Sequence, residues 1–168
     1  DDFKYWLSDG WDKIQGEKWK APMYWEKIDD KWTTYDFLGK RKINPNEPVC
    51  HVSYYEADAY CKWAGKRLPT EAEWEKAACW DEKNQRKTIF PWGDESPDTV
   101  HANLLESYIW NCAEIGTYPN GKSHYGCHQM IGDVWEWTSS EFSGYPGFKT
   151  GFSEYNDKWF ANQKVLRG

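Results

Sequence analysis

The chain has 168 residues, which suits one domain with a single hydrophobic core. Its formal net charge is −6, with Lys and Arg scattered among Asp and Glu, so no basic stripe is available to bind nucleic acid. No apolar run approaches the roughly 18 residues of a membrane helix, and the first ten residues lack the features of a signal peptide. We therefore expect neither nucleic acid nor a membrane as a partner.

Aromatic residues make up 18% of the chain, whereas the mean hydropathy is only −0.96. Rings with a polar atom are therefore expected to form much of the core. The five cysteines are odd in number and include no CxxC pair, which favours a reducing compartment, and we expect a cytoplasmic protein. Each cysteine is interpreted as a small buried apolar side chain.

Two helices are predicted in the middle of the chain. Ser53 and Glu56 have the spacing of a capping box, apolar positions follow at helical steps, and Gly65 is a suitable C-terminal residue. Thr70 and Glu73 form a second capping box, followed by Trp74 and two alanines at helical spacing. These signals predict two short helices joined by a tight connection.

Turn residues dominate beyond residue 80, so only short strands are expected there. Residues 134–138 alternate, with Trp135 and Trp137 on one face, and predict a strand; residues 165–167 predict another. The last strand stops in mid-pattern at Gly168. We therefore expect an α+β fold with two short helices, short strands and long loops, in which residues 1–168 form a single domain truncated at both ends.

Several sequence blocks resemble the formylglycine-generating-enzyme (sulfatase-modifying factor) superfamily. The longest, PVCHVSYYEADAYCKWAGKRLPTEAEWE at 48–75, resembles the hallmark segment of that superfamily. FPWGD at 90–94, ANL at 102–104, YG at 125–126 and MIGDVWEWTS at 130–139 follow in the family's order. The resemblance implies an irregular fold related to C-type lectins, with bound ions, which agrees with the predicted elements.

Within the superfamily, other blocks are similar to the ergothioneine-type, iron-dependent sulfoxide synthases. These blocks are YWLSDGW at 5–11, APMYW at 21–25, YPGF at 145–148, FSEY at 152–155 and VLRG at 165–168. The resemblance implies an oxidoreductase that uses O2 and non-haem Fe(II) to join cysteine or γ-glutamylcysteine to trimethylhistidine. In that family a separate N-terminal helical domain supplies the iron ligands in an HxxxHxE-type motif. Since this chain has no such motif, we expect it to be inactive alone.

The resemblance also implies that residues 145–155 form a wall of the active site. By that alignment Phe148 and Phe152 contact the substrate, and a family tyrosine that donates a proton falls at Phe152, which has no proton to give. Tyr155 is the candidate to replace it. The structural alternative is that Tyr155 is a half-buried loop residue.

The resemblance implies calcium at either of two positions, Asn103 with the Leu104 carbonyl or Asp133 with Glu136, whose oxygens are of the type that hard cations bind. The alternative for the two carboxylates is hydrogen bonding within a turn and a strand. His124, Cys127 and His128 have a spacing that could chelate a soft metal on a helix. Because they flank Gly126 in an expected turn, we interpret them as loop residues.

Two other functions remain open at the level of the sequence. One is a copper-dependent oxidase that converts a sulfatase cysteine to formylglycine, which would require a cysteine pair shortly after Gly168. The other is a non-catalytic, lectin-like module whose aromatic residues contact a ligand or a partner. A fold alone does not decide among them.

Overall fold

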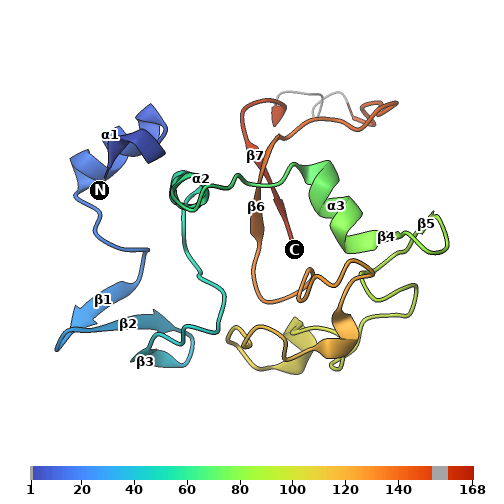
Figure 1. Cartoon of the computed structure of the whole chain (residues 1–168), viewed down its shortest axis with the longest axis horizontal. Helices are drawn as coiled ribbons and strands as arrows, with labels where there is room; N and C mark the ends of the chain where they lie inside the picture. Colours follow the sequence, from blue (N-terminus) through green and yellow to red (C-terminus); the bar gives the residue numbers. More distant parts are fainter. Residues whose placement is uncertain (1, 153–158) are drawn as a thin grey trace.

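Long loops connect short helices and three small antiparallel sheets in the computed structural model, which describes residues 2–152 and 159–168 (Figure 1). In this part of the chain the α-helices are α1 (Ser8–Glu17), α2 (Tyr54–Trp63) and α3 (Glu71–Cys79), and the 3-10 helices are η1 (Phe3–Tyr5), η2 (Leu105–Ser107) and η3 (Pro119–Gly121). The strands are β1 (Trp25–Ile28), β2 (Lys31–Asp36), β3 (Gly39–Lys42), β4 (Trp80–Asp81), β5 (Arg86–Lys87), β6 (Glu136–Glu141) and β7 (Lys164–Arg167). This irregular α+β arrangement confirms the predicted fold class.

Both predicted capping boxes are present, and they set the start of α2 and α3. Ser53 Oγ accepts from the Glu56 amide at 3.3 Å, and Glu56 Oε2 accepts from the Ser53 amide at 2.7 Å. Thr70 and Glu73 repeat the pattern at 3.2 and 2.8 Å. Beyond α2, Gly65 has φ +68°, the left-handed conformation expected of a residue that ends a helix.

Helix α1 was not predicted, and it packs against α2. Its N-cap is Leu7, whose side chain forms no capping hydrogen bond. At Gly10 the two helices approach closely, because a Cβ added there would lie 2.7 Å from Tyr55 Cβ. Glycine at this position therefore allows the contact that holds the N-terminal helix in place.

The sheet β1-β2-β3 was also not predicted, and it lies at the lower left of Figure 1. Trp25 pairs with Thr34 in the first hairpin, and Thr33 pairs with Lys42 in the second. The tight turn of the first hairpin uses Asp29 and Asp30, both with positive φ. Two consecutive left-handed residues are typical of a two-residue hairpin turn whose twist matches the strands.

Strand β6 begins two residues later than expected, at Glu136. Asp133 adopts a left-handed conformation with φ +59°, and the Val134 amide donates to the Gly132 carbonyl at 2.7 Å. This turn prevents the chain from being extended before Trp135, which stays outside the strand. The predicted strand at 165–167 is confirmed as β7, which pairs antiparallel to β6 with an irregularity between Trp137 and Glu141.

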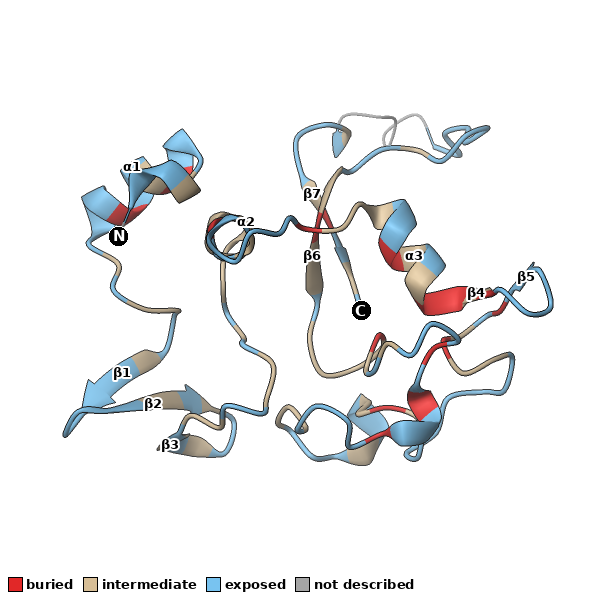
Figure 2. Ribbon diagram, viewed as in Figure 1, coloured by how far each residue is buried: buried red, intermediate tan, exposed pale blue. Residues whose placement is uncertain are grey.

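The core lies around α3 rather than among the aromatic rings (Figure 2). Trp74, Ala78, Cys79 and Met130 form the buried cluster. Among the described aromatic residues, Trp74 and Tyr118 are the buried ones, so the expectation of a mainly aromatic core was wrong. The other buried apolar side chains are aliphatic or contain sulfur, and most rings remain at the surface.

The cysteine expectation was only partly correct. All five thiols are free, Cys79 is buried, and the other four are half-buried.

In the described residues, no helix combines the length and the apolar character required to cross a membrane.

Candidate functional site

A cavity of about 660 Å³ opens between the β1-β2-β3 sheet and three loops. The loops are the segment before α2, the segment around η2 and the turn that precedes β6. The lining residues used below are Trp25, Tyr35, Phe37, Arg41, Glu47, Cys50, His51, Asn103, Leu104, Trp110, Asn111, Cys112, Asp133, Trp135 and Trp137. The volume lies in the range of small-molecule sites.

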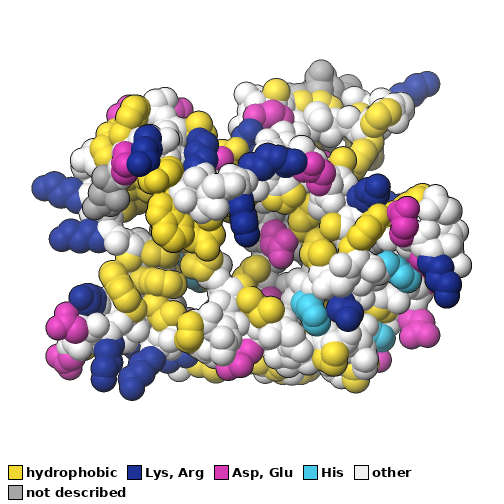
Figure 3. Space-filling model, in the orientation of Figure 1, with side chains coloured by type: hydrophobic (Ala, Val, Ile, Leu, Met, Phe, Trp, Pro, Cys, Tyr) yellow, Lys and Arg dark blue, Asp and Glu magenta, His cyan; other side chains and the backbone are white. Residues whose placement is uncertain are grey.

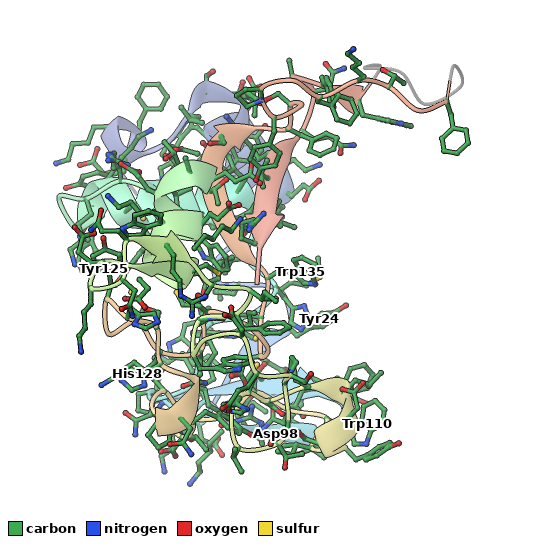
Figure 4. All side chains as sticks on the ribbon, turned by 90° about the vertical axis from the view of Figure 1, so that its right-hand side faces the viewer. Tyr24, Asp98, Trp110, Tyr125, His128 and Trp135 are labelled. Carbon is green, nitrogen blue, oxygen red and sulfur yellow. The ribbon has the colours of Figure 1, made fainter. Side chains whose placement is uncertain are left out.

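The cavity is rich in aromatic side chains, several of which are exposed. Phe37, Trp135 and Trp110 have exposed fractions of 89%, 72% and 51%. Figure 3 shows hydrophobic side chains gathered on the face between the helices α1 and α2 and the β1-β2-β3 sheet. In Figure 4, Trp110 and Trp135 lie on one side of the molecule, whereas Tyr125 and His128 lie on the other. Exposed apolar surface of this kind usually marks a binding site or an interface.

Arg41 is the charged centre of one cavity wall. Its guanidinium donates to Asp36 at 2.5 Å, to Glu47 at 2.7 Å and to Asn111 at 2.9 Å. Burial alone would lower the Arg41 pKa, but the hydrogen bonds to Asp36 and Glu47 outweigh burial and raise it. Because its Nε and Nη2 donors are engaged by these three partners, Arg41 holds this wall together.

Asp133 organises another part of the cavity lining. Its Oδ1 accepts from Asn103 Nδ2 at 2.8 Å and from the Ala113 amide at 2.7 Å, and its Oδ2 accepts from Gln129 Nε2 at 2.6 Å. One carboxylate therefore connects its own turn to the segments of Asn103 and Ala113, which are 30 and 20 positions away in sequence. These contacts agree with the alternative given from the sequence, in which the Asp133 carboxylate forms hydrogen bonds and does not bind calcium.

Of the two expected calcium positions, Asn103 and Leu104 lie together on the cavity, whereas Asp133 and Glu136 lie in two different places. Asn103 and Asp133 are in contact, and Leu104 lines the same cavity. Glu136 instead accepts from the Trp74 indole at 2.6 Å, in a second hollow beside α3. In the present arrangement Asn103 turns its amide nitrogen, not its oxygen, toward Asp133, so the oxygens of these residues do not form a common cage.

Three cavity residues have left-handed backbone conformations without being glycine: His51 with φ +59°, Trp110 with φ +59° and Asp133 with φ +59°. Such conformations are strained for large side chains and tend to cluster at functional sites. The His51 ring also packs edge-on against Tyr24, with centroids 4.9 Å apart. Sequence reasoning did not select His51, Trp110 or Arg41, because the cavity assembles from segments that no single motif covers.

The family model for the sulfatase-modifying factor enzyme 1-like domain matches residues 2–168. The chain belongs to this family. It is 41% identical over 167 residues to the hercynine oxygenase of Mycobacterium tuberculosis, and 42% identical over 171 residues to that of Mycolicibacterium thermoresistibile. Both alignments cover 98% of this chain but only 39% and 37% of the relatives, so the chain spans less than half of their length.

A second group of relatives consists of formylglycine-generating enzymes. The enzyme of Streptomyces coelicolor is 37% identical over 146 residues, covering 79% of this chain and 41% of that protein. The formylglycine-generating enzyme of Bos taurus is 43% identical over 108 residues, which are 56% of this chain. The hercynine oxygenases therefore match a larger share of the chain, at a similar identity.

The described part of the loop expected to line the active site, residues 145–152, does not line the cavity. Phe148 packs against Phe160 with ring centroids 5.8 Å apart, and its exposed fraction is 56%. Phe152 is 72% exposed, and neither ring lines the cavity. Tyr155 lies outside the described residues. Its role, like those of Phe148 and Phe152, stays a prediction.

A metal site requires several ligand side chains that converge on one point. In residues 2–152 and 159–168 no three His, Cys, Asp or Glu side chains converge in this way. His124 lies 3.7 Å from Asp81, and Cys127 packs against the core, around the turn at Gly126 that was expected from the sequence. The described part of the chain thus offers no complete ligand set for iron.

Proposed function

We propose that this chain is the C-terminal domain of a non-haem-iron sulfoxide synthase. The enzyme would join cysteine or γ-glutamylcysteine to trimethylhistidine with O2, as in ergothioneine biosynthesis. The observation that carries the proposal is the 41% identity to a hercynine oxygenase across 98% of this chain. That agreement extends well beyond the hallmark segment shared with the formylglycine-generating enzymes.

The lining of the cavity suits a small cationic substrate. Its aromatic faces are exposed, and the face of a tryptophan or tyrosine ring attracts quaternary ammonium groups. Trimethylhistidine carries such a group next to an imidazole ring. Asp36 and Glu47 together carry two negative charges against the single positive charge of Arg41, so this cluster would favour a positive charge in the cavity.

The iron and a second domain complete the proposed enzyme. An N-terminal helical domain would supply the iron ligands, because the described residues contain no complete set. Bound Fe(II) would activate O2, while this chain would form a wall of the active site. In that wall Tyr155 would donate a proton and Phe148 and Phe152 would contact the substrate, in a cytoplasmic enzyme.

The test uses the complete protein that contains this chain, with Fe(II), O2, trimethylhistidine and either sulfur donor. We expect mass spectrometry to detect the sulfoxide product with the complete protein and none with residues 1–168 alone. A complete protein that is loaded with iron but forms no sulfoxide would contradict the proposal. Turnover by residues 1–168 alone would show that the iron ligands lie within the chain.

A formylglycine-generating oxidase is the second candidate, favoured by the 37% identity to the Streptomyces coelicolor enzyme. It would use copper bound by cysteines that follow Gly168. Incubation of the same complete protein with Cu(I) and a sulfatase peptide that contains cysteine would give a formylglycine product. That product, without sulfoxide formation, would replace the first proposal.

Calcium at Asn103, Leu104, Asp133 and Glu136 is a separate proposal. Calcium favours carboxylate, amide and carbonyl oxygens. Because these side chains are directed toward other partners, binding would require Asn103 to rotate its amide and Glu136 to leave Trp74. A calcium-dependent rise in Tm that is absent in Asp133→Asn would support the site, and an unchanged Tm would count against it.

A further inference from the structure

Two cysteines that are 62 positions apart in sequence meet in the cavity wall. The Sγ atoms of Cys50 and Cys112 are 3.3 Å apart, within hydrogen-bond contact for sulfur. Cys50 lies in the segment before α2, and Cys112 lies in the loop after η2. Over residues 2–152 and 159–168, no other pair of cysteine sulfurs is in such contact.

Neither sulfur has a hydrogen-bond partner closer than the other sulfur. Cys50 Sγ has a long contact of 3.6 Å to the Pro48 carbonyl, and Cys112 Sγ has one of 3.9 Å to the Asp133 carbonyl. Both thiols are half-buried and line the cavity. A small molecule that enters the cavity therefore reaches them without unfolding of the core around α3.

The two thiols also differ in acidity. The hydrogen bond from the Cys112 thiol stabilises the Cys50 thiolate and lowers the Cys50 pKa, against the opposing effects of burial and of Glu47 and Asp133. The same hydrogen bond, together with burial, raises the pKa of Cys112. The pair thus contains one thiol that ionises first and a neighbour that keeps its proton, which is the usual division between an attacking and a resolving thiol.

We propose that Cys50 and Cys112 form a reversible dithiol–disulfide site that is oxidised by low-molecular-weight disulfides. The Cys50 thiolate attacks one sulfur of the small disulfide, which forms a mixed disulfide and releases the first small thiol. Cys112 then loses its proton and attacks Cys50 Sγ, which releases the second small thiol. Overall, the two protein thiols give up two electrons and two protons, and the small disulfide is reduced to two thiols.

The geometry is close to what this reaction needs. A disulfide bond is about 2.05 Å long, so the sulfurs must approach each other by about 1.3 Å. Both residues lie on irregular segments, where side-chain rotation and small backbone shifts can supply that movement. The new bond would tie the segment that carries His51 to the loop that carries Trp110, and would fix two walls of the cavity relative to each other.

The site does not depend on which substrate the cavity accepts, because it consists only of the two sulfurs and their neighbours. Reversible disulfides that form in reducing compartments are usually redox-sensing or catalytic rather than structural. A bond that encloses α2 and α3 in its loop also removes many conformations from the unfolded chain. Oxidation should therefore stabilise the domain as well as restrict the cavity.

The experiment treats the reduced complete protein with glutathione disulfide and digests it with trypsin without reduction. Trypsin releases residues 43–62 with Cys50 and Cys61, and residues 88–122 with Cys112. We expect a disulfide-linked pair of these two peptides, and a rise in Tm on the order of 10 °C that dithiothreitol reverses. Absence of the linked pair, with Cys112 still open to alkylation, would overturn the proposal.

Two variants identify the sulfur that takes part. Cys61→Ser is the matched control, because Cys61 shares the tryptic peptide but has no partner sulfur, and the link should form as in the wild type. Cys50→Ser should abolish the link. A link that persists in Cys50→Ser, or that disappears in Cys61→Ser, would assign the bond to Cys61 and refute the proposed pair.

Discussion

Glu136 is a half-buried carboxylate whose environment favours its neutral form. Burial raises its pKa, and the hydrogen bond from the Trp74 indole, 2.6 Å away, offsets only part of that effect. Because the pKa of Glu136 is raised in the folded state, its contribution to stability is fully present below the unfolded pKa, near 4.5. That contribution is lost as the pH rises through the pKa of the folded state. At neutral pH the ionised Glu136 is therefore a cost to the domain.

We expect Glu136→Gln to stabilise the domain at pH 7 by roughly 1 kcal/mol or less, because the amide oxygen still accepts from Trp74 but carries no charge. The gain should shrink as the pH falls toward 4.5, where the wild-type carboxyl is neutral. Thermal unfolding at several pH values measures it. If Glu136→Gln is less stable than the wild type at pH 7, the hydrogen bond from Trp74 to the charged carboxylate stabilises the domain by more than burial of that charge destabilises it.

The matched control is Glu106→Gln. Glu106 is exposed in η2 and has no side-chain partner in the structure, so its substitution should leave the Tm within about 1 °C at every pH. If both variants gain the same stability at pH 7, the cause is the reduced net negative charge of the chain rather than the burial of Glu136.

At the scale of the element, α1 contains two glycines with different surroundings. A Cβ at Gly10 would lie 2.7 Å from both Cβ and Cγ of Tyr55 on α2, whereas a Cβ at Gly16 would meet nothing within 4 Å. Gly10→Ala should lower the stability by about 1–3 kcal/mol, since the helices must move apart. Gly16→Ala should instead add about 0.5–1 kcal/mol through helix propensity.

Chemical denaturation of both variants, followed by circular dichroism, measures these changes. If the Gly10→Ala domain is as stable as the Gly16→Ala domain, the close contact between α1 and Tyr55 is contradicted. That result would mean that α1 is not held against Tyr55 in solution, since the intrinsic preference for alanine would be the same at both positions.

The predicted and the missed elements differ in the kind of signal they carry. Helices α2 and α3 begin at capping boxes, which are local and readable from four residues. Helix α1 has Leu7 as its N-cap, without a side-chain capping bond, and contains two glycines, so propensity argued against it. In the β1-β2-β3 sheet no position is buried, and the partly buried positions include the charged Asp36 and Arg41, which leaves a weak hydrophobic pattern.

The candidate site was less accessible to sequence reasoning than the fold. Asn103 and Asp133 were selected and do meet, but the resemblance supplied them, not a local pattern. The Cys50–Cys112 contact depends on the path of two loops that have no periodicity. The turn at Asp133 also displaced the predicted strand, because a left-handed residue in a non-glycine position leaves no signal in hydrophobic spacing.

At the scale of the whole molecule, polar contacts attach the β1-β2-β3 sheet to the rest of the described chain near the cavity. Arg41 on β3 bonds to Asn111, Asn44 Nδ2 donates to Glu114 at 2.8 Å, and the Ile115 amide donates to the Asn46 carbonyl at 2.8 Å. The buried cluster lies elsewhere, around α3. This arrangement indicates a sheet that can open locally while the core remains folded.

Arg41→Met tests that inference. The Arg41 side chain is 27% exposed and its partners Asp36 and Glu47 are 16% and 14% exposed, so its loss leaves two carboxylates close together without a cation. We expect a loss of about 2 kcal/mol, less than for a fully buried pair. Hydrogen exchange should accelerate for amides of β2 and β3, while amides of α3 keep their protection.

Arg86→Met is the control for the loss of an arginine that lies outside the cavity wall. Its pair with Asp94 has exposed fractions of 50% and 43%, so the expected loss is below about 0.5 kcal/mol, with no change of exchange in the sheet. Equal acceleration of exchange in β2 and α3 after Arg41→Met would show that the sheet and the core unfold together. Faster exchange confined to the sheet would instead establish that Arg41 closes one wall of the cavity onto a core that folds without it.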